Sequence, residues 1–159
     1  MSLLRVRYSS LNPPLSHLVA TSSFFAQSVA ALKRKAVKGE AVMEISVFSG
    51  DWRENRKRLP TLLPWISGPE PLLEVREIDS KGLESEPLKP DYFARRIRQL
   101  RKIELETQMS VDLEEGFIKR PAEFQPHDEE WAEPGASPNG GPATASGSSG
   151  VGEGPPSVR

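Results

Sequence analysis

The sequence predicts an α/β fold, a small βαβ-containing domain with an N-terminal helix and an extended C-terminal tail. Residues 41–48 and 72–78 alternate apolar and polar side chains, which predicts strands. Residues 51–66 and the stretch after Pro90 instead repeat apolar residues at helical spacing. A βαβ connection crosses over right-handed, so we expect parallel strands with helices covering a face of the sheet.

Residues 1–39 form a basic, serine-rich segment without any Asp or Glu, which is typical of mitochondrial targeting segments. Within it, apolar residues at helical spacing predict a helix over about 17–37 that ends in a basic cluster. This stripe consists of Leu18, Phe25, Val29, Leu32 and Ala36. Two interpretations stay open: a cleaved transit peptide, or a retained arm that docks its stripe on a partner and its lysines on phosphate.

The domain proper is predicted to span residues 40–105. Its first strand places Met43, Ile45 and Val47 on one face. In the following helix Pro60 removes a backbone donor and clashes with the preceding turn, so we expect a kink or a fresh start near Leu59.

Residues 79–89 contain Gly82 and Pro87, which indicates either a turn or a degenerate edge strand. The last helix should begin at Pro90 or Asp91 and end near residue 105. We expect residues 106–133 to form an extended acidic tail whose large apolar side chains lie on another surface. The Gly-, Ser- and Pro-rich residues 134–159 are expected to be disordered.

Several classes of chemistry find no support in this sequence. The absence of cysteine excludes disulfides, thiolate catalysis and cysteine-ligated zinc. His17 and His127 do not fit a catalytic triad or a metal site, and the glycines lack phosphate-loop or dinucleotide spacing. No apolar run is long enough to predict a transmembrane segment. We therefore expect no enzyme activity, no metal and no cofactor.

The basic clusters are more informative about function. Three such clusters in one small chain favour binding to a phosphate backbone, and to RNA in particular. A single cluster of this kind would equally suit a solvated helix face. The predicted RNA-binding residues are Arg5, Arg7, Lys33, Arg34, Lys35 and Lys38 in the N-terminal segment, Arg53, Arg56, Lys57 and Arg58 on the first domain helix, and Arg95, Arg96, Arg98, Arg101 and Lys102 on the last. The predicted protein-interface residues are Phe25, Val29, Phe117, Ile118, Phe124 and Trp131.

A strand, a basic helix with "RLPTLLPW", a proline-bearing turn and "LLEV" together resemble the thioredoxin-like family of small mitochondrial ribosomal proteins, which also includes one accessory subunit of a respiratory complex. The family's amphipathic N-terminal helix is matched by "LSHLVATSSFFAQSVAALKRK". Its basic–proline step before a tryptophan is matched by Lys119, Arg120, Pro121 and Trp131. The resemblance covers about residues 15–131. The hairpin that the family usually carries before the last helix is reduced here to "DSKGLESEPLK".

This resemblance implies a thioredoxin-like domain in a structural constituent of the mitochondrial large ribosomal subunit. Such a protein would lie in the mitochondrial matrix, contact rRNA and neighbouring ribosomal proteins, and have no enzymatic activity. The alternative that the same family allows is an accessory scaffold subunit of a mitochondrial respiratory complex.

Overall fold

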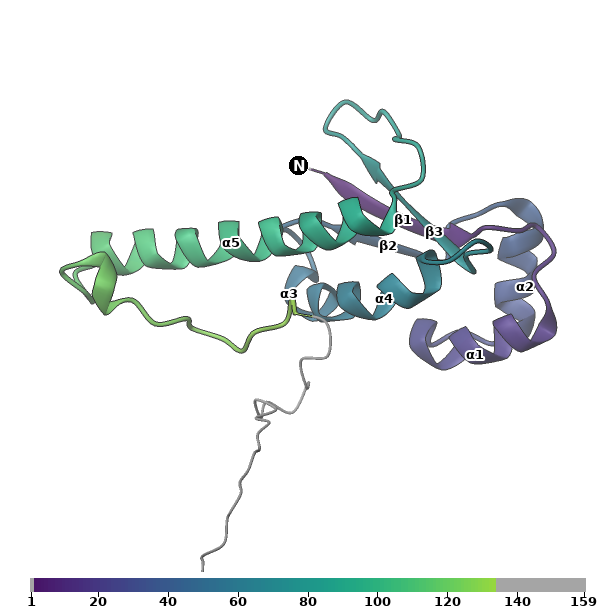
Figure 1. Ribbon diagram of the computed structural model, residues 1–159, viewed down its shortest axis with the longest axis horizontal. Coiled ribbons are helices and arrows are strands. Elements are labelled where there is room, and N and C mark those ends of the chain that lie inside the picture. The colour runs from purple at the N-terminus through teal and green to yellow at the C-terminus, as the bar shows by residue number, and fades with distance from the viewer. Residues whose placement is uncertain (1, 134–159) are drawn as a thin grey trace, which may run out of the picture.

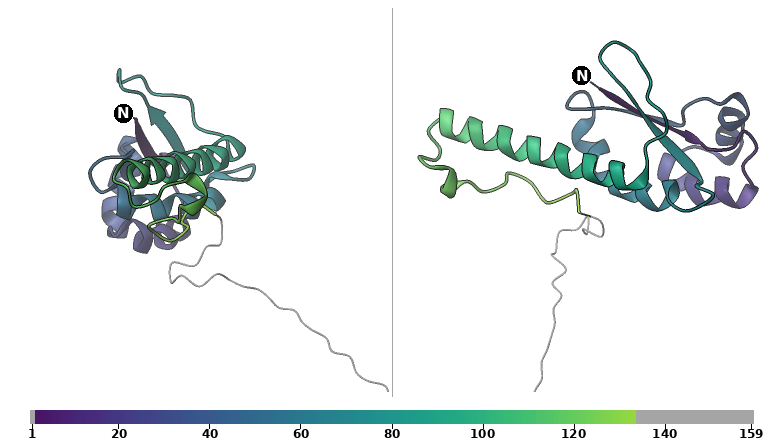
Figure 2. Two further views of the ribbon diagram at one scale, coloured as in Figure 1. Left: turned by 90° about the vertical axis from the view of Figure 1, so that its left-hand side faces the viewer. Right: turned by 45° about the horizontal axis from the view of Figure 1, so that its top comes forward.

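The computed structural model describes residues 2–133 and shows a mixed α/β fold with a three-stranded sheet (Figures 1 and 2). The strands are β1 (Leu3–Tyr8), β2 (Met43–Ser46) and β3 (Leu73–Ile78), in the order β2-β1-β3. β1 pairs antiparallel with both neighbours. β2 and β3 therefore run in the same direction, as expected for a βαβ unit, but they do not pair because β1 lies between them.

The central strand β1 comes from the segment that the sequence suggested to be an arm. Leu4, Val6 and Tyr8 are buried beneath the helices, while Arg5 and Arg7 lie on the opposite, half-exposed face. The expected boundary between residues 39 and 40 thus falls inside one folded unit, and the prediction of a separate N-terminal arm was wrong.

The single helix predicted over 17–37 is two helices, α1 (Leu15–Phe25) and α2 (Val29–Lys38), whose axes are bent by 109°. Ala26 ends α1 in the left-handed conformation with φ 53°, and the Ser28 hydroxyl accepts a hydrogen bond from the Ala31 amide at 3.1 Å to cap α2. The predicted stripe still faces the core across this break. Leu18, Phe25, Leu32 and Ala36 are buried.

The proline-containing helix restarts where the sequence predicted. α3 (Trp52–Asn55) and the 3₁₀ turn η1 (Arg56–Arg58) are followed by α4 (Leu59–Ile66), which carries Pro60 in its first turn. Proline is tolerated at that place because a first-turn amide has no partner within the helix.

Residues 79–89 combine the two alternatives, because residues 79–83 form a turn and residues 84–88 pair in part with the outer edge of β3. Ile78 and Glu84 form an isolated antiparallel bridge, and the Ser85 amide donates to the Glu77 carbonyl at 2.8 Å. The Leu88 amide donates to the Val75 carbonyl at 2.8 Å. This partial pairing shields an edge that would otherwise offer free backbone groups.

The last helix, α5 (Pro90–Glu114), is longer than predicted and projects beyond the sheet (Figure 1). The prediction of an extended chain from residue 106 was therefore wrong up to Glu114, because Leu105, Glu106 and Met109 are good helix formers that continue the helix. Gly116, with φ 80°, then reverses the chain.

Residues 117–132, here called the return segment, run back along α5 and contain the 3₁₀ turn η2 (Pro121–Glu123) (Figures 1 and 2). The surface on which this tail lies is thus part of the chain itself. The predicted disorder of residues 134–159 lies outside the described residues.

Candidate functional site

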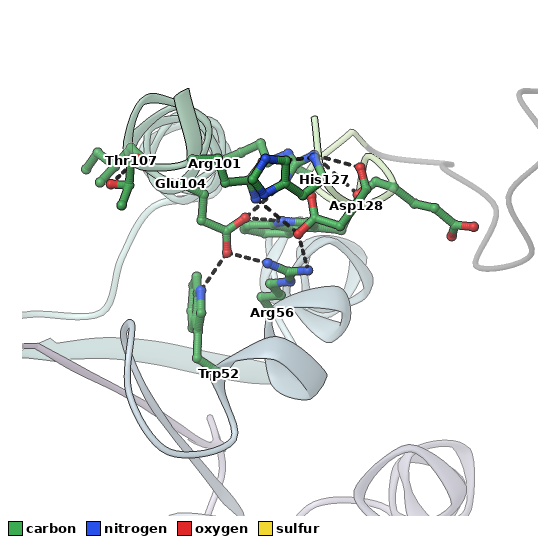
Figure 3. A network of polar contacts seen from close by, with 12 residues as sticks. Trp52, Arg56, Arg101, Glu104, Thr107, His127 and Asp128 are labelled. Carbon is green, nitrogen blue, oxygen red and sulfur yellow. Dashed lines mark hydrogen bonds and ion pairs between the residues drawn. The ribbon is translucent and has the colours of Figure 1, made fainter. Parts of the chain in front are cut away.

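A buried polar cluster joins α3 and η1, α5 and the return segment (Figure 3). At its centre the Glu104 carboxylate accepts hydrogen bonds from Trp52 Nε1 at 2.7 Å, Arg56 Nη1 at 2.6 Å, Arg101 Nη1 at 2.9 Å and Trp131 Nε1 at 2.9 Å. The two indole rings also pack edge to face, with centroids 5.7 Å apart. One carboxylate therefore holds three separate parts of the chain.

Asp128 completes this cluster from the return segment. Its carboxylate accepts from Arg101 Nη1 at 2.7 Å and from Arg56 Nη2 at 2.8 Å. The exposed fractions of Glu104, Arg56 and Arg101 are only 8%, 5% and 4%, so these charges compensate one another out of water. We call these six residues the clasp: Trp52, Arg56, Arg101, Glu104, Asp128 and Trp131.

Further polar contacts set the register of the return segment on α5. His127 Nε2 lies 2.8 Å from Asp112 Oδ2, and the His127 amide donates to Gln108 Oε1 at 3.0 Å. The order of contacts from Asp112 through Gln108 to Glu104 shows that the segment runs antiparallel to the helix.

Both carboxylates of the clasp accept hydrogen bonds from Arg56 and Arg101, so neither is a free base, whereas Arg56 Nε is buried without a hydrogen-bond partner in the described part of the chain. Among residues 2–133 no cluster of His, Asp and Glu stands ready to hold a metal ion. The clasp therefore positions the return segment and supports α5.

Stability should depend on pH through the clasp. Burial alone would raise the pKa of Glu104, but hydrogen bonds from Trp131, Arg56, Trp52 and Arg101 outweigh it and lower this pKa. Burial would likewise raise the pKa of Asp128, and hydrogen bonds from Arg101 and Arg56 lower it instead. Because the unfolded chain takes up these protons more readily, the free energy of unfolding should be at its full value above about pH 5 and decline as the pH falls through about 4 and below.

Urea unfolding across a pH series measures this decline, and Glu104→Gln should make it shallower. A free energy of unfolding that stays constant or rises as the pH falls would contradict the ionised clasp.

Two predicted RNA-binding residues, Arg56 and Arg101, belong to the clasp. Their guanidinium groups are buried and ion-paired within the chain, so the expectation that they face a phosphate backbone is corrected. The prediction that Trp131 lies in an interface with another protein is corrected as well, because its ring is buried against Trp52 of the same chain.

Other predicted cations are also paired within the chain. On the open face of the sheet, Arg5 lies 2.7 Å from Glu44, and Arg7 lies 2.8 Å from Glu84. Arg96 on α5 lies 2.8 Å from Glu77 on β3. These ion pairs connect neighbouring strands and the last helix.

Two other basic side chains contact uncharged groups instead. Arg58 stacks on the Phe24 ring, 4.4 Å from its centroid, and donates to the Phe24 carbonyl; burial lowers the pKa of this arginine. Lys35 donates to Gln27 Oε1 at 2.7 Å. Both side chains thus help to hold α1 and α2 in place.

The remaining predicted cations are exposed, and within residues 2–133 seven of them make no ion pair: Lys33, Arg34 and Lys38 on α2, Arg53 on α3, Lys57 in η1, and Arg95 and Arg98 on α5. Lys102 is exposed as well and lies 4.0 Å from Glu106. Arg95, Arg98 and Lys102 follow one another at i, i+3 and i+7 and so share one face of α5. We call these three the α5 row.

The α5 row borders an open groove of about 380 Å³ between α5 and the return segment. Leu105, Met109 and Phe124 form its apolar lining, while the charged lining consists of Arg98, Arg101, Lys102 and one carboxylate, Glu106. Phe124 is thus the predicted interface residue that lies beside the exposed cations.

The other predicted interface residues lie in varied surroundings. Phe25 is buried in the core, so the prediction that it contacts a partner protein is corrected, and Val29 is packed against that core. Ile118 is half-buried, whereas Phe117 is 76% exposed at the far end of α5.

Among the predicted RNA-binding residues, the exposed cations of α2, α3 with η1, and α5 are thus those that remain available to a partner. Comparison of this chain with protein-family models, with curated proteins and with solved structures gives no match.

Proposed function

We propose that this chain is a non-catalytic RNA-binding protein, a structural constituent of the mitochondrial large ribosomal subunit. The observation that carries the proposal is the α5 row, whose arginines remain exposed without ion pairs in the described part of the chain, while five other predicted RNA-binding arginines are paired internally. Exposed Arg and Lys side chains at fixed spacing bind phosphate backbones by displacing counterions.

The support beneath the α5 row makes it a suitable platform for RNA. Phe93, Ile97 and Leu100 anchor the opposite side of α5 in the core, and the clasp holds the helix further along. The row spans about 10 Å at the rise of an α-helix. Its cations are therefore held on a rigid element, which lowers the ordering cost of binding.

The ribosomal assignment and the thioredoxin-like fold rest on the family resemblance and form part of the proposal. The partial strand over residues 79–89 supports it, since it stands where the family carries its hairpin. Location in the mitochondrial matrix, with rRNA and ribosomal proteins as partners, follows from the same resemblance. The family resemblance did not predict that β1 lies between β2 and β3, the two strands of the βαβ unit.

Replacement of Arg95, Arg98 and Lys102 by glutamate should weaken binding to structured RNA and reduce its salt dependence. Each lost phosphate contact lowers the slope of log K against log salt concentration by about 0.7–0.9, so the slope should decrease by roughly 2–3. Fluorescence anisotropy across a salt series measures both effects.

The matched control is Lys33→Glu/Arg34→Glu/Lys38→Glu, which makes the same change of charge on α2. A wild-type affinity and salt slope in the α5-row variant would refute the proposed site.

The ribosomal assignment is tested by sedimentation of a mitochondrial lysate with and without RNase, with the chain followed by mass spectrometry. Co-sedimentation with the large ribosomal subunit, lost on RNase treatment, is the expected result. A position among detergent-solubilised respiratory complexes that RNase leaves unchanged would replace this assignment with a scaffold subunit.

A further inference from the structure

Aliphatic side chains gather on the outer side of α1 and α2. Leu11, Leu15, Val19 and Val37 are 62%, 66%, 58% and 57% exposed, although the inner sides of both helices are buried in the core. Leu15 and Val19 are one turn apart on α1, and Leu11 lies against Gly39 at the end of α2. Large exposed apolar patches on a folded chain mark contact sites.

Cations lie among these aliphatic side chains. Lys33 lines a hollow of about 440 Å³ together with Leu15, and it also lines a second hollow of about 390 Å³ with Arg34, Val37 and Lys38. Lys33 thereby connects the exposed side of α1 to that of α2. We call this combined surface, aliphatic and basic, the α1–α2 face.

The segment that forms the face contributes no negative charge to it. Residues 1–39 contain no Asp or Glu, and residues 8–32 contain no Lys or Arg either. The face therefore combines an aliphatic part with a part whose charged groups are all cations. A partner that complements both parts has an apolar surface bordered by anionic groups.

We propose that the α1–α2 face binds the surface of an anionic lipid bilayer, with its aliphatic side chains entering at headgroup level and Lys33, Arg34 and Lys38 meeting the phosphates. Basic residues beside exposed aliphatic ones are the chemistry of peripheral membrane binding. A protein partner fits less well, because protein interfaces are poor in lysine and rich in aromatic residues. On this face both lysines are exposed, whereas Phe24 and Phe25 turn towards the core.

The geometry suits binding along a membrane surface. Within residues 2–133 no single helix is long and apolar enough to span a bilayer; α1 and α2 reach that length only as a pair bent by 109°. Their buried side chains are committed to the core, which leaves only the outer side for lipid. The face lies at the opposite end of the molecule from the free end of α5 (Figure 1), so this inference concerns other residues than the proposed RNA site.

Vesicle flotation with the full chain tests the inference. The protein should float with vesicles of phosphatidylcholine and phosphatidylglycerol, remain unbound with phosphatidylcholine alone, and dissociate as salt is added. Lys33→Glu/Arg34→Glu/Lys38→Glu should weaken partition on the order of 100-fold, since each basic residue near an anionic surface contributes roughly fivefold.

Leu15→Ser/Val19→Ser should weaken partition roughly tenfold or more, because the aliphatic side chains no longer enter the bilayer. Both positions are exposed, so the urea midpoint of this variant should equal that of the wild type. The α5-row variant is the matched control and should float like the wild type.

The inference is overturned if the wild type fails to bind anionic vesicles, or if the Leu15→Ser/Val19→Ser variant floats unchanged, which would leave charge attraction alone. It is also overturned if the α2 charge variant loses RNA binding and keeps vesicle binding. RNA binding of every variant is measured in parallel, so the lipid and RNA proposals can fail independently.

Discussion

A chain lacking residues 1–9 should fail to fold. β1 is the only strand with which β2 and β3 pair in the described sheet, so its removal leaves β2 unpaired and β3 with only the partial pairing of residues 84–88. It also removes the buried Leu4, Val6 and Tyr8, each of which contributes about 1.5–3 kcal/mol by burial. That loss is comparable to the whole stability of a small domain, about 5–15 kcal/mol. The cooperative urea transition should disappear.

Two point variants within β1 make this experiment specific. Val6→Asp places a charge at a fully buried position and should prevent folding. Arg5→Thr removes only half-exposed ion pairs on the other face and should cost about 1 kcal/mol or less. A truncated chain with the urea midpoint of the wild type would contradict the central position of β1. This strand lies within the segment that resembles a transit peptide, so failure of the truncated chain to fold would show that a chain cleaved after residue 39 cannot keep this fold.

Glu104→Gln should destabilise the fold by about 3–5 kcal/mol, the usual cost of removing one partner from a buried ion pair. The amide keeps the shape of the side chain but removes one of the two carboxylates that neutralise Arg56 and Arg101, so only Asp128 remains to balance them. Urea unfolding measures the loss. Limited proteolysis should in addition cut the return segment faster, because Trp131 loses its carboxylate partner.

Glu106→Gln is the matched control, since it makes the same change two residues further along α5. Its side chain is 59% exposed and lies 4.0 Å from Lys102, so a change of less than about 1 kcal/mol is expected. Equal effects of the two substitutions would show that the clasp contributes nothing specific.

Local patterns predicted those elements whose cause is local. The alternation of β3, the restart at Leu59 and the start of α5 all follow from side chains within a few residues. The residues of β1 also alternate, since the apolar Leu4 and Val6 take turns with the basic Arg5 and Arg7 along the strand. Its basic composition nevertheless suggested a targeting segment, and no pattern within the strand shows that its partners lie far along the chain.

The clasp was missed for a related reason. Arg56, Arg101 and Glu104 look like ordinary charges of solvated helix faces, and Asp128 lies in a stretch without periodicity. One signal was present: Glu104 continues the buried spacing of Phe93, Ile97 and Leu100 by one further turn of α5. An acid at such a position predicts a buried partner, but the identity of that partner depends on how the chain returns.

The order of the strands also determines when the sheet can form during synthesis. β1 leaves the ribosome first, yet its register pairs Val6 with Met43 on one side and Leu3 with Ile78 on the other. β1 therefore stays unpaired, with its apolar side chains exposed, until the residues of β2 and β3 have been synthesised. Such distant pairing slows folding and exposes the nascent chain to aggregation, so we expect this protein to depend on chaperones during its synthesis.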